Sequence, residues 1–112
     1  MGLPSRYEDF VRTGNFTEDE RDAKFLAGLG LAGESGEVAD IIKKHLLHGK
    51  PLDRDHLKEE LGDVLWYLQH ACIVFNIPLF EVAHGNILKL CKRYPDGYGD
   101  PAEWFKPKEE GP

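Results

Sequence analysis

The chain has 112 residues and a formal net charge of −6, and 41% of its residues are hydrophobic and 30% charged. This length predicts one globular domain, and the acidic balance argues against a general nucleic-acid-binding protein, which carries a basic surface. The longest stretch without a charged residue, 64–80, contains Gln, His, Asn and Pro, so we expect no membrane span.

The first half of the chain predicts two helices. Residues 4–12 indicate a short helix with Ser5 as its cap. Thr17 and Glu20 match a capping box with Thr17 as the N-cap, which predicts a second helix that continues to about residue 47. Four glycines lie inside it, and each costs about 1 kcal/mol relative to alanine: Gly28, Gly30, Gly33 and Gly36. We interpret them as points of close backbone approach that leave room for metal, water and ligand; alternatively, the helix breaks near residues 28–33.

A third helix is predicted over about 54–76, beginning after Pro51 and Asp53. Its apolar residues recur at helical spacing, but over 64–75 they cover nearly the whole circumference. A helix that is apolar all round is buried on every side, and one small chain cannot surround it. We therefore expect a four- to five-helix, all-α bundle that is completed by homo-oligomerisation, as a homodimer or homotetramer.

The C-terminal part begins with Pro78 at the first position of a fourth helix, which is predicted over about 78–93. A turn follows at 94–97. Residues 99–112 predict an irregular tail, in which Trp104 and Phe105 dock onto the rest of the protein.

We treat residues 1–112 as a single domain with a core of about 17–98. Cys72 and Cys91 fall in apolar helical patterns. They are predicted to be free core thiols in a reducing compartment, so we expect a cytoplasmic protein without an N-terminal signal.

Two pairs of carboxylates carry the strongest chemical signal. Glu34 and Glu37 lie three residues apart, as do Glu60 and Asp63, and on a helix this spacing places each pair on one face. A turn at 48–51 predicts that the two helices fold back, so that the four carboxylates converge. Such a cluster repels itself unless a hard cation neutralises it. We predict a catalytic Mg²⁺ site, with Mn²⁺ as a substitute; the alternative is two solvated helix faces.

A second signal is the face of the fourth helix that carries Asn86, Lys89 and Arg93 at i, i+3 and i+7. An amide and two cations suit a polyphosphate chain. The alternative is a basic last turn that complements the helix dipole.

Two further residues are candidates for binding substrate. Lys44 lies two turns beyond the first acidic pair and could reach phosphate, or it is an ordinary exposed lysine. Tyr67 lies one turn beyond the second pair and could stack on a nucleobase. Trp66 is predicted to be a core or interface residue instead.

Three stretches resemble the MazG-like family of all-α nucleotide pyrophosphohydrolases. They are GLAGESGEV around Glu34, EELGDVLWYL around Asp63 and NILKLCKRYPDGY from Asn86, and the likeness covers about residues 25–98. The resemblance implies a homo-oligomeric helical bundle that hydrolyses a nucleoside triphosphate to the monophosphate and pyrophosphate with Mg²⁺.

The same resemblance implies roles for individual residues. The four carboxylates would bind metal, Asn86 and Lys89 would contact phosphate or sugar, and Tyr67 would face the nucleoside. Many relatives carry a further Glu where this chain has Gly33, and Glu59 is a candidate substitute.

Two rival functions stay open at this stage. The sequence Glu81-Val-Ala-His84 is one of the two Glu-x-x-His motifs that a di-iron carboxylate bundle requires. A non-catalytic helical protein that binds a partner is the alternative from another class.

Overall fold

The structure is a computed structural model that describes residues 3–14 and 17–107. These residues form helices and no strand, which confirms the all-α class. The helices are α1 (Leu3–Thr13), α2 (Glu20–Leu47), α3 (Arg54–Val74), α4 (Leu79–Arg93), α5 (Pro95–Tyr98) and α6 (Pro101–Trp104). The chain divides into two compact units, Met1–Ile77 and Pro78–Pro112, each of which is described by itself. The single domain over 1–112 stays a prediction.

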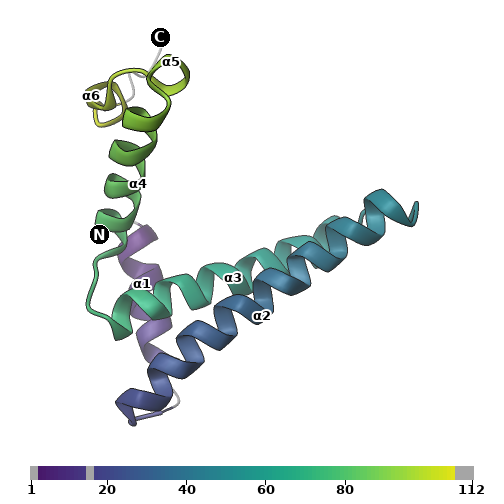
Figure 1. The fold of residues 1–112 in the computed structure, drawn as a ribbon. Helices are drawn as coiled ribbons and strands as arrows, with labels where there is room; N and C mark the ends of the chain where they lie inside the picture. Colours follow the sequence, from purple (N-terminus) through teal and green to yellow (C-terminus); the bar gives the residue numbers. More distant parts are fainter. Residues whose placement is uncertain (1–2, 15–16, 108–112) are drawn as a thin grey trace. The chain divides into compact units, whose positions relative to one another are not determined.

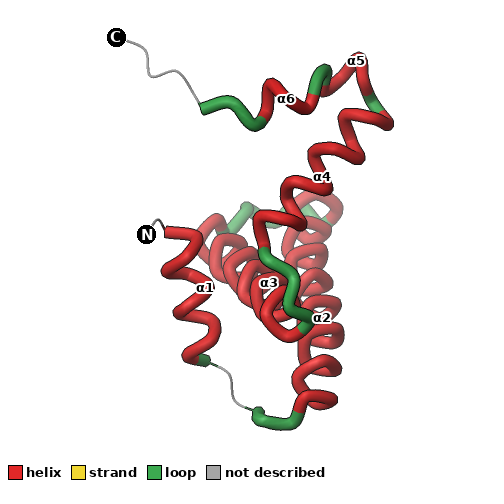
Figure 2. Tube along the Cα trace, turned by 90° about the vertical axis from the view of Figure 1, so that its left-hand side faces the viewer, coloured by secondary structure: helices red, strands yellow, loops and turns green. Residues whose placement is uncertain are grey.

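The first unit is built on a long antiparallel hairpin of α2 and α3, which lie side by side (Figure 1). Figure 2 shows the same pair after a quarter turn, with α1 beside α3. Val11 of α1 is fully buried, and Gly14 lies against the ring of Trp66. The hairpin is therefore the frame that positions any side chain on the facing sides of α2 and α3.

The helix starts follow local capping, with corrections to the predictions. Asp19, and not Thr17, is the N-cap of α2, because its carboxylate accepts a hydrogen bond from the N–H of Asp22. Thr17 instead accepts from the N–H of Asp19. The predicted capping box is therefore wrong, while Asp53 caps α3 by accepting from the N–H of His56. Asp and Thr side chains can both accept hydrogen bonds from the free N–H groups at a helix start. Here Asp19, the more C-terminal of the two candidates, is the cap.

Two other predicted helix starts also shift. Ser5 lies inside α1, which begins at Leu3, so the predicted cap is wrong; its side chain is outside the described residues. Pro78 is the N-cap of α4 and precedes its first helical residue. The ring fixes φ and removes the N–H group, and both properties are compatible with either position.

The glycines do not break α2, which is continuous from Glu20 to Leu47, so the alternative of a broken helix is wrong. Close approach is confirmed at Gly30, where a β-carbon would collide with the ring of Tyr67. At Gly28, Gly33 and Gly36 no described atom other than those of the adjacent residues and the surrounding helix backbone lies within 4 Å of the β-carbon position. Gly33 directly precedes Glu34 and Gly36 follows it two residues later, so the helix surface near Glu34 is open at both positions.

Few side chains of the first unit are buried. Among the described residues, its buried apolar side chains are those of Val11, Ala23, Ala27 and Cys72, and Gln69 and His70 are buried polar ones. Large apolar side chains remain exposed on both helices of the hairpin, for example Leu29 (71% exposed) and Leu65 (43%). Exposed apolar surface of this extent marks an interaction site. The covering second subunit stays a prediction.

In the second unit the tail folds back along α4. The indole N–H of Trp104 donates to the carbonyl oxygen of Tyr98 over 3.0 Å. The ring centroids of Phe105 and His84 lie 4.2 Å apart. The predicted docking of both aromatic residues is confirmed. Residues 101–104, predicted to be irregular, form α6 because Asp100 caps it and Pro101 occupies its first turn.

No single helix of the described ranges is long and apolar enough to span a membrane; α3 and α4 meet the length and composition criteria only when they are taken together.

Candidate metal centre

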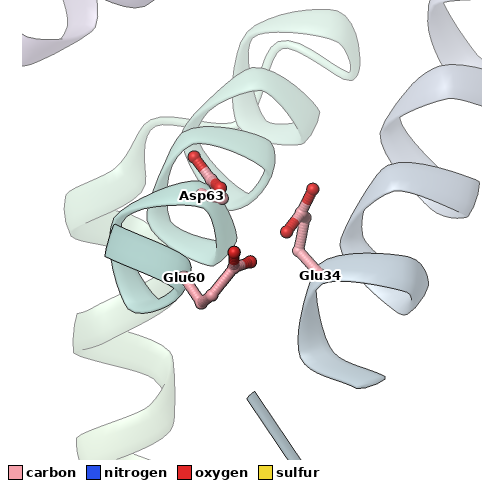
Figure 3. Close-up of side chains that lie close together, drawn as sticks. All are labelled: Glu34, Glu60 and Asp63. Atoms are coloured by element: carbon pink, nitrogen blue, oxygen red, sulfur yellow. The ribbon is translucent and has the colours of Figure 1, made fainter. Parts of the chain in front are cut away.

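Three of the four predicted carboxylates meet between α2 and α3. Glu34, Glu60 and Asp63 each offer an oxygen, and these oxygens lie within 4.8 Å of one another. Figure 3 shows Glu34 reaching from α2 toward the other two side chains on α3. Glu34 and Glu60 are half-buried and Asp63 is exposed. Glu60 and Asp63 share a face of α3 because they are three residues apart.

The electrostatics of this cluster favour a bound positive charge. A hydrogen bond with Glu60, followed by desolvation and the negative charges of Asp63, Glu60 and Glu37, raises the pKa of Glu34 above its ordinary value of 4.5. Each of these causes disfavours the ionised carboxylate. The cluster therefore holds a proton more tightly than an isolated glutamate, and a cation in its place would relieve the same repulsion.

Glu37 lies outside the group of three converging oxygens. It is exposed on α2 and lines a pocket of about 260 Å³ at the end of the hairpin, together with Lys44 and His56. Its charge nevertheless contributes to the raised pKa of Glu34. Glu37 is therefore near the cluster without belonging to it as the side chains stand.

His56, an exposed residue of α3, was not among the predicted site residues, although it lies beside the cluster. Its Nε2 atom lies 3.5 Å from Oε1 of Glu60, one turn along α3. The signal that was available is the i, i+4 spacing of the two residues. This imidazole therefore lies within ion-pair distance of one of the three clustered carboxylates.

Lys44 is bound to a neighbour on its own helix. Its Nζ atom lies 2.7 Å from Oδ2 of Asp40, and this contact raises the pKa of Lys44 and lowers the pKa of Asp40. Both side chains are about half exposed, so the pair is weak and can open. Its predicted contact with phosphate stays a prediction.

Tyr67 is half-buried, with its ring against the backbone of α2 at Gly30. Trp66 is also half-buried; its ring stacks on His70 at 5.0 Å and meets the edge of Tyr67 at 5.1 Å. These contacts support the core assignment of Trp66. The stacking of Tyr67 on a nucleobase stays a prediction.

Asn86, Lys89 and Arg93 lie on α4 in the second unit, and all three are exposed. Asn86 lines a cavity that the tail closes with Tyr98 and Trp104. Sequence reasoning missed this cavity, because nothing local in the tail shows which helix it contacts.

Glu59 is the candidate substitute for the glutamate that many relatives carry at the position of Gly33, and His84 belongs to the Glu-x-x-His motif of the di-iron alternative. Glu59 is exposed and lines a shallow hollow on α3 together with Asp63, but it is not among the three carboxylates that converge. His84, half of the single Glu-x-x-His motif, packs on Phe105. Within the described ranges the cluster itself contains no histidine.

Comparison with known proteins gives one family match. The sequence profile of the MazG nucleotide pyrophosphohydrolase domain matches residues 26–98, a stretch that contains all nine predicted site residues. The gene 37 protein of Mycobacterium phage L5 is 37% identical over 73 residues, which cover 62% of this chain and 64% of that relative. The match thus spans less than two thirds of the relative's length. No solved structure matches the chain.

Proposed function

Because the chain belongs to the MazG nucleotide pyrophosphohydrolase family, we propose that it hydrolyses a nucleoside triphosphate, ribo or deoxy, to the monophosphate and pyrophosphate with Mg²⁺. The observation that carries the proposal is the convergence of Glu34, Glu60 and Asp63 from two helices. Such a reaction hydrolyses the anhydride bond between the α- and β-phosphates, and it would suit control of the nucleotide pool.

The three carboxylates fit a hard divalent cation. Mg²⁺ prefers carboxylate and water oxygens, so Glu34, Glu60 and Asp63 would hold it with one oxygen each. The oxygens of the cluster lie within 4.8 Å of one another, and the cation would offset their mutual repulsion. The absence of histidine from the described cluster favours Mg²⁺ or Mn²⁺ over iron or zinc.

Glu37 is the fourth proposed ligand. It lies one helical turn beyond Glu34, at a spacing that brings Cβ atoms to about 5–6 Å. The side chain of Glu37 is exposed on α2. We therefore propose that Glu37 turns toward Glu34 when the cation binds.

In the proposed reaction a water oxygen bonds to the α-phosphorus, and the bond from this phosphorus to the oxygen that bridges the α- and β-phosphates breaks. Pyrophosphate leaves with the bonding electron pair, and one proton of the water passes to solvent by way of a carboxylate. Mg²⁺, when bound, neutralises the phosphate charge and lowers the pKa of the water. Lys89 and Arg93 would hold the pyrophosphate through charge-assisted hydrogen bonds.

The exposed apolar side chains of the hairpin support the proposal that the protein works as a homodimer or homotetramer. They are Phe25, Leu26, Leu29, Ile42, Leu46, Leu47, Leu61, Leu65 and Phe75. They come from the two helices that carry the carboxylates, apart from Phe75, which directly follows α3, so association would also fix the geometry of the site. Cys72 and Cys91 are free and buried, which fits a reducing compartment such as the cytoplasm.

The test is to incubate the protein with Mg²⁺ and a panel of ribo- and deoxynucleoside triphosphates and to identify the products by chromatography. The proposal expects monophosphate and pyrophosphate, and no turnover with a chelator. Diphosphate with orthophosphate would show that the cleaved bond is wrong. A protein that turns over no nucleotide with Mg²⁺ or Mn²⁺ would instead be a non-catalytic binding protein.

A further inference from the structure

The second unit contains a cavity of about 210 Å³ between α4 and the tail, which we name the tail cavity. It is lined by Asn86, Ile87, Leu90, Cys91, Tyr98 and Trp104. The first four residues lie on one face of α4, and the two aromatic residues close the cavity from the tail. It lies wholly within one unit of the chain.

Contacts outside the tail cavity hold Trp104 and the residue after it in place. The indole N–H of Trp104 is used in its hydrogen bond to the carbonyl of Tyr98, and the next residue, Phe105, packs on His84. The side chains of Trp104 and Tyr98 nevertheless remain 57% and 47% exposed. Trp104 therefore offers an anchored aromatic surface to a ligand, and Tyr98 offers a second exposed ring.

The lining is apolar except for one side chain. Ile87 and Leu90 are half-buried, and Cys91 is buried at the floor. Asn86 supplies a carboxamide, which donates and accepts hydrogen bonds at the same time. An aromatic wall with one amide is suited to a planar heterocycle, which stacks by its face and hydrogen-bonds by its edge.

The volume of the tail cavity and the charges beside it restrict the class of ligand further. The cavity is smaller than the roughly 300–1,000 Å³ of pockets for drug-sized molecules, so it suits one ring system and not a whole nucleotide. Lys89 and Arg93 follow Asn86 at i+3 and i+7 on the same helix. A ligand with its ring in the cavity and its anionic groups along α4 would satisfy both features.

We propose that the tail cavity binds the nucleobase of the substrate, stacked on Trp104 and recognised at its edge by Asn86. This inference rests on the proposed function, and it assigns Asn86 to the base, whereas the sequence resemblance implied phosphate or sugar. It makes the tail the determinant of base preference and leaves the phosphates to Lys89 and Arg93.

The first test measures KM and kcat for four triphosphates that differ only in the base, using the wild type, Trp104→Leu and Asn86→Leu. Base stacking and edge recognition predict a KM higher by about tenfold with kcat changed much less. Asn86→Leu should also flatten the preference among bases. Phe80→Leu, an exposed aromatic change on α4 outside the cavity, is the matched control and should leave KM unchanged. Unchanged KM and base preference in both cavity variants would overturn the proposal.

The second test needs no turnover. Titration with nucleosides that lack phosphate should quench the tryptophan fluorescence of the wild type. Trp104→Phe, which keeps an aromatic ring, should remove the quench and so assign it to Trp104, since Trp66 is the other tryptophan. In Asn86→Leu, half-maximal quenching should require a nucleoside concentration about tenfold higher than in the wild type.

These two measurements separate the failure of the inference from the failure of the proposed function. Quenching by nucleosides without any hydrolysis of triphosphates would keep the base site and refute the enzyme. Hydrolysis without quenching, and with unchanged KM in the cavity variants, would keep the enzyme and refute the base site. Circular dichroism of each variant checks that the helices are intact.

Discussion

The ring of Tyr67 on α3 occupies the space that a β-carbon would need at Gly30 on α2. The two helices of the hairpin are therefore in close contact at a point where one residue has no side chain and the other has a large flat one. This contact lies about one turn from Glu34 along α2 and one turn from Asp63 along α3. It sets the separation of the helices that carry the candidate metal ligands.

Gly30→Ala should lower the free energy of unfolding by about 1–3 kcal/mol, because overpacking forces the ring or the helix to move. Gly28→Ala is the matched control, since no described atom lies within 4 Å of that position. It should raise stability by about 1 kcal/mol through helix propensity. Urea unfolding of both variants measures the difference, and equal stabilisation by both would contradict the close packing of Tyr67.

Glu34→Gln should stabilise the metal-free protein, and by more as the pH rises from acid to neutral. The pKa of Glu34 is raised, chiefly by its hydrogen bond with Glu60. The stability that its proton contributes is therefore fully present below the ordinary pKa of 4.5 and is lost as the pH rises through the raised value. The glutamine variant does not titrate and avoids this loss.

Saturating Mg²⁺ should reverse the order, so that the wild type becomes more stable than Glu34→Gln at neutral pH, because ligand binding stabilises the folded state. Urea midpoints across pH, with and without Mg²⁺, measure both effects. A difference between the two proteins that is the same at every pH would contradict the electrostatic account of Glu34.

Lys44→Ala should raise KM by no more than about fivefold. The lysine is paired with Asp40. An exposed ion pair contributes about 0–1 kcal/mol, so breaking this pair changes the free energy little. Lys89→Ala should raise KM by more than about tenfold, as expected for a hydrogen bond to a charged group. Steady-state kinetics compares the two variants; a larger effect at Lys44 would place the polyphosphate at the end of the hairpin.

Leu65→Glu should dissociate the proposed oligomer, because a charge would replace an apolar side chain that is 43% exposed in the single chain. Light scattering in solution should show a fall to the mass of one chain. Lys58→Glu, an exposed change on the same helix, is the control and should keep the oligomer. A wild-type protein that is already monomeric would refute the proposed association.

Much of the fold follows from local sequence. The capping residue Asp53, the turn before it and the apolar periodicity of residues 54–74 suffice to predict α3. The same logic predicted α2 across its glycines, although its cap was assigned two residues too early. The error arose because Thr17 and Asp19 can both accept a hydrogen bond from a helix start.

The candidate site was predictable only in part. The i, i+3 spacing of carboxylates on two adjacent helices was enough to expect Glu34, Glu60 and Asp63 together. The outward position of Glu37 depends on a rotamer, which spacing does not specify. The tail cavity depends on a contact between Trp104 and α4 that is distant in the sequence, and no periodicity reports it.

Binding of Mn²⁺ measured by calorimetry, in the wild type, Glu34→Gln and Asp63→Asn, tests the metal centre most directly. The account predicts saturable binding by the wild type and affinity weaker by at least about tenfold in both variants, because each removes a charged ligand and keeps the shape of its side chain. Wild-type affinity in Glu34→Gln and Asp63→Asn would contradict the proposal that these carboxylates hold the catalytic cation.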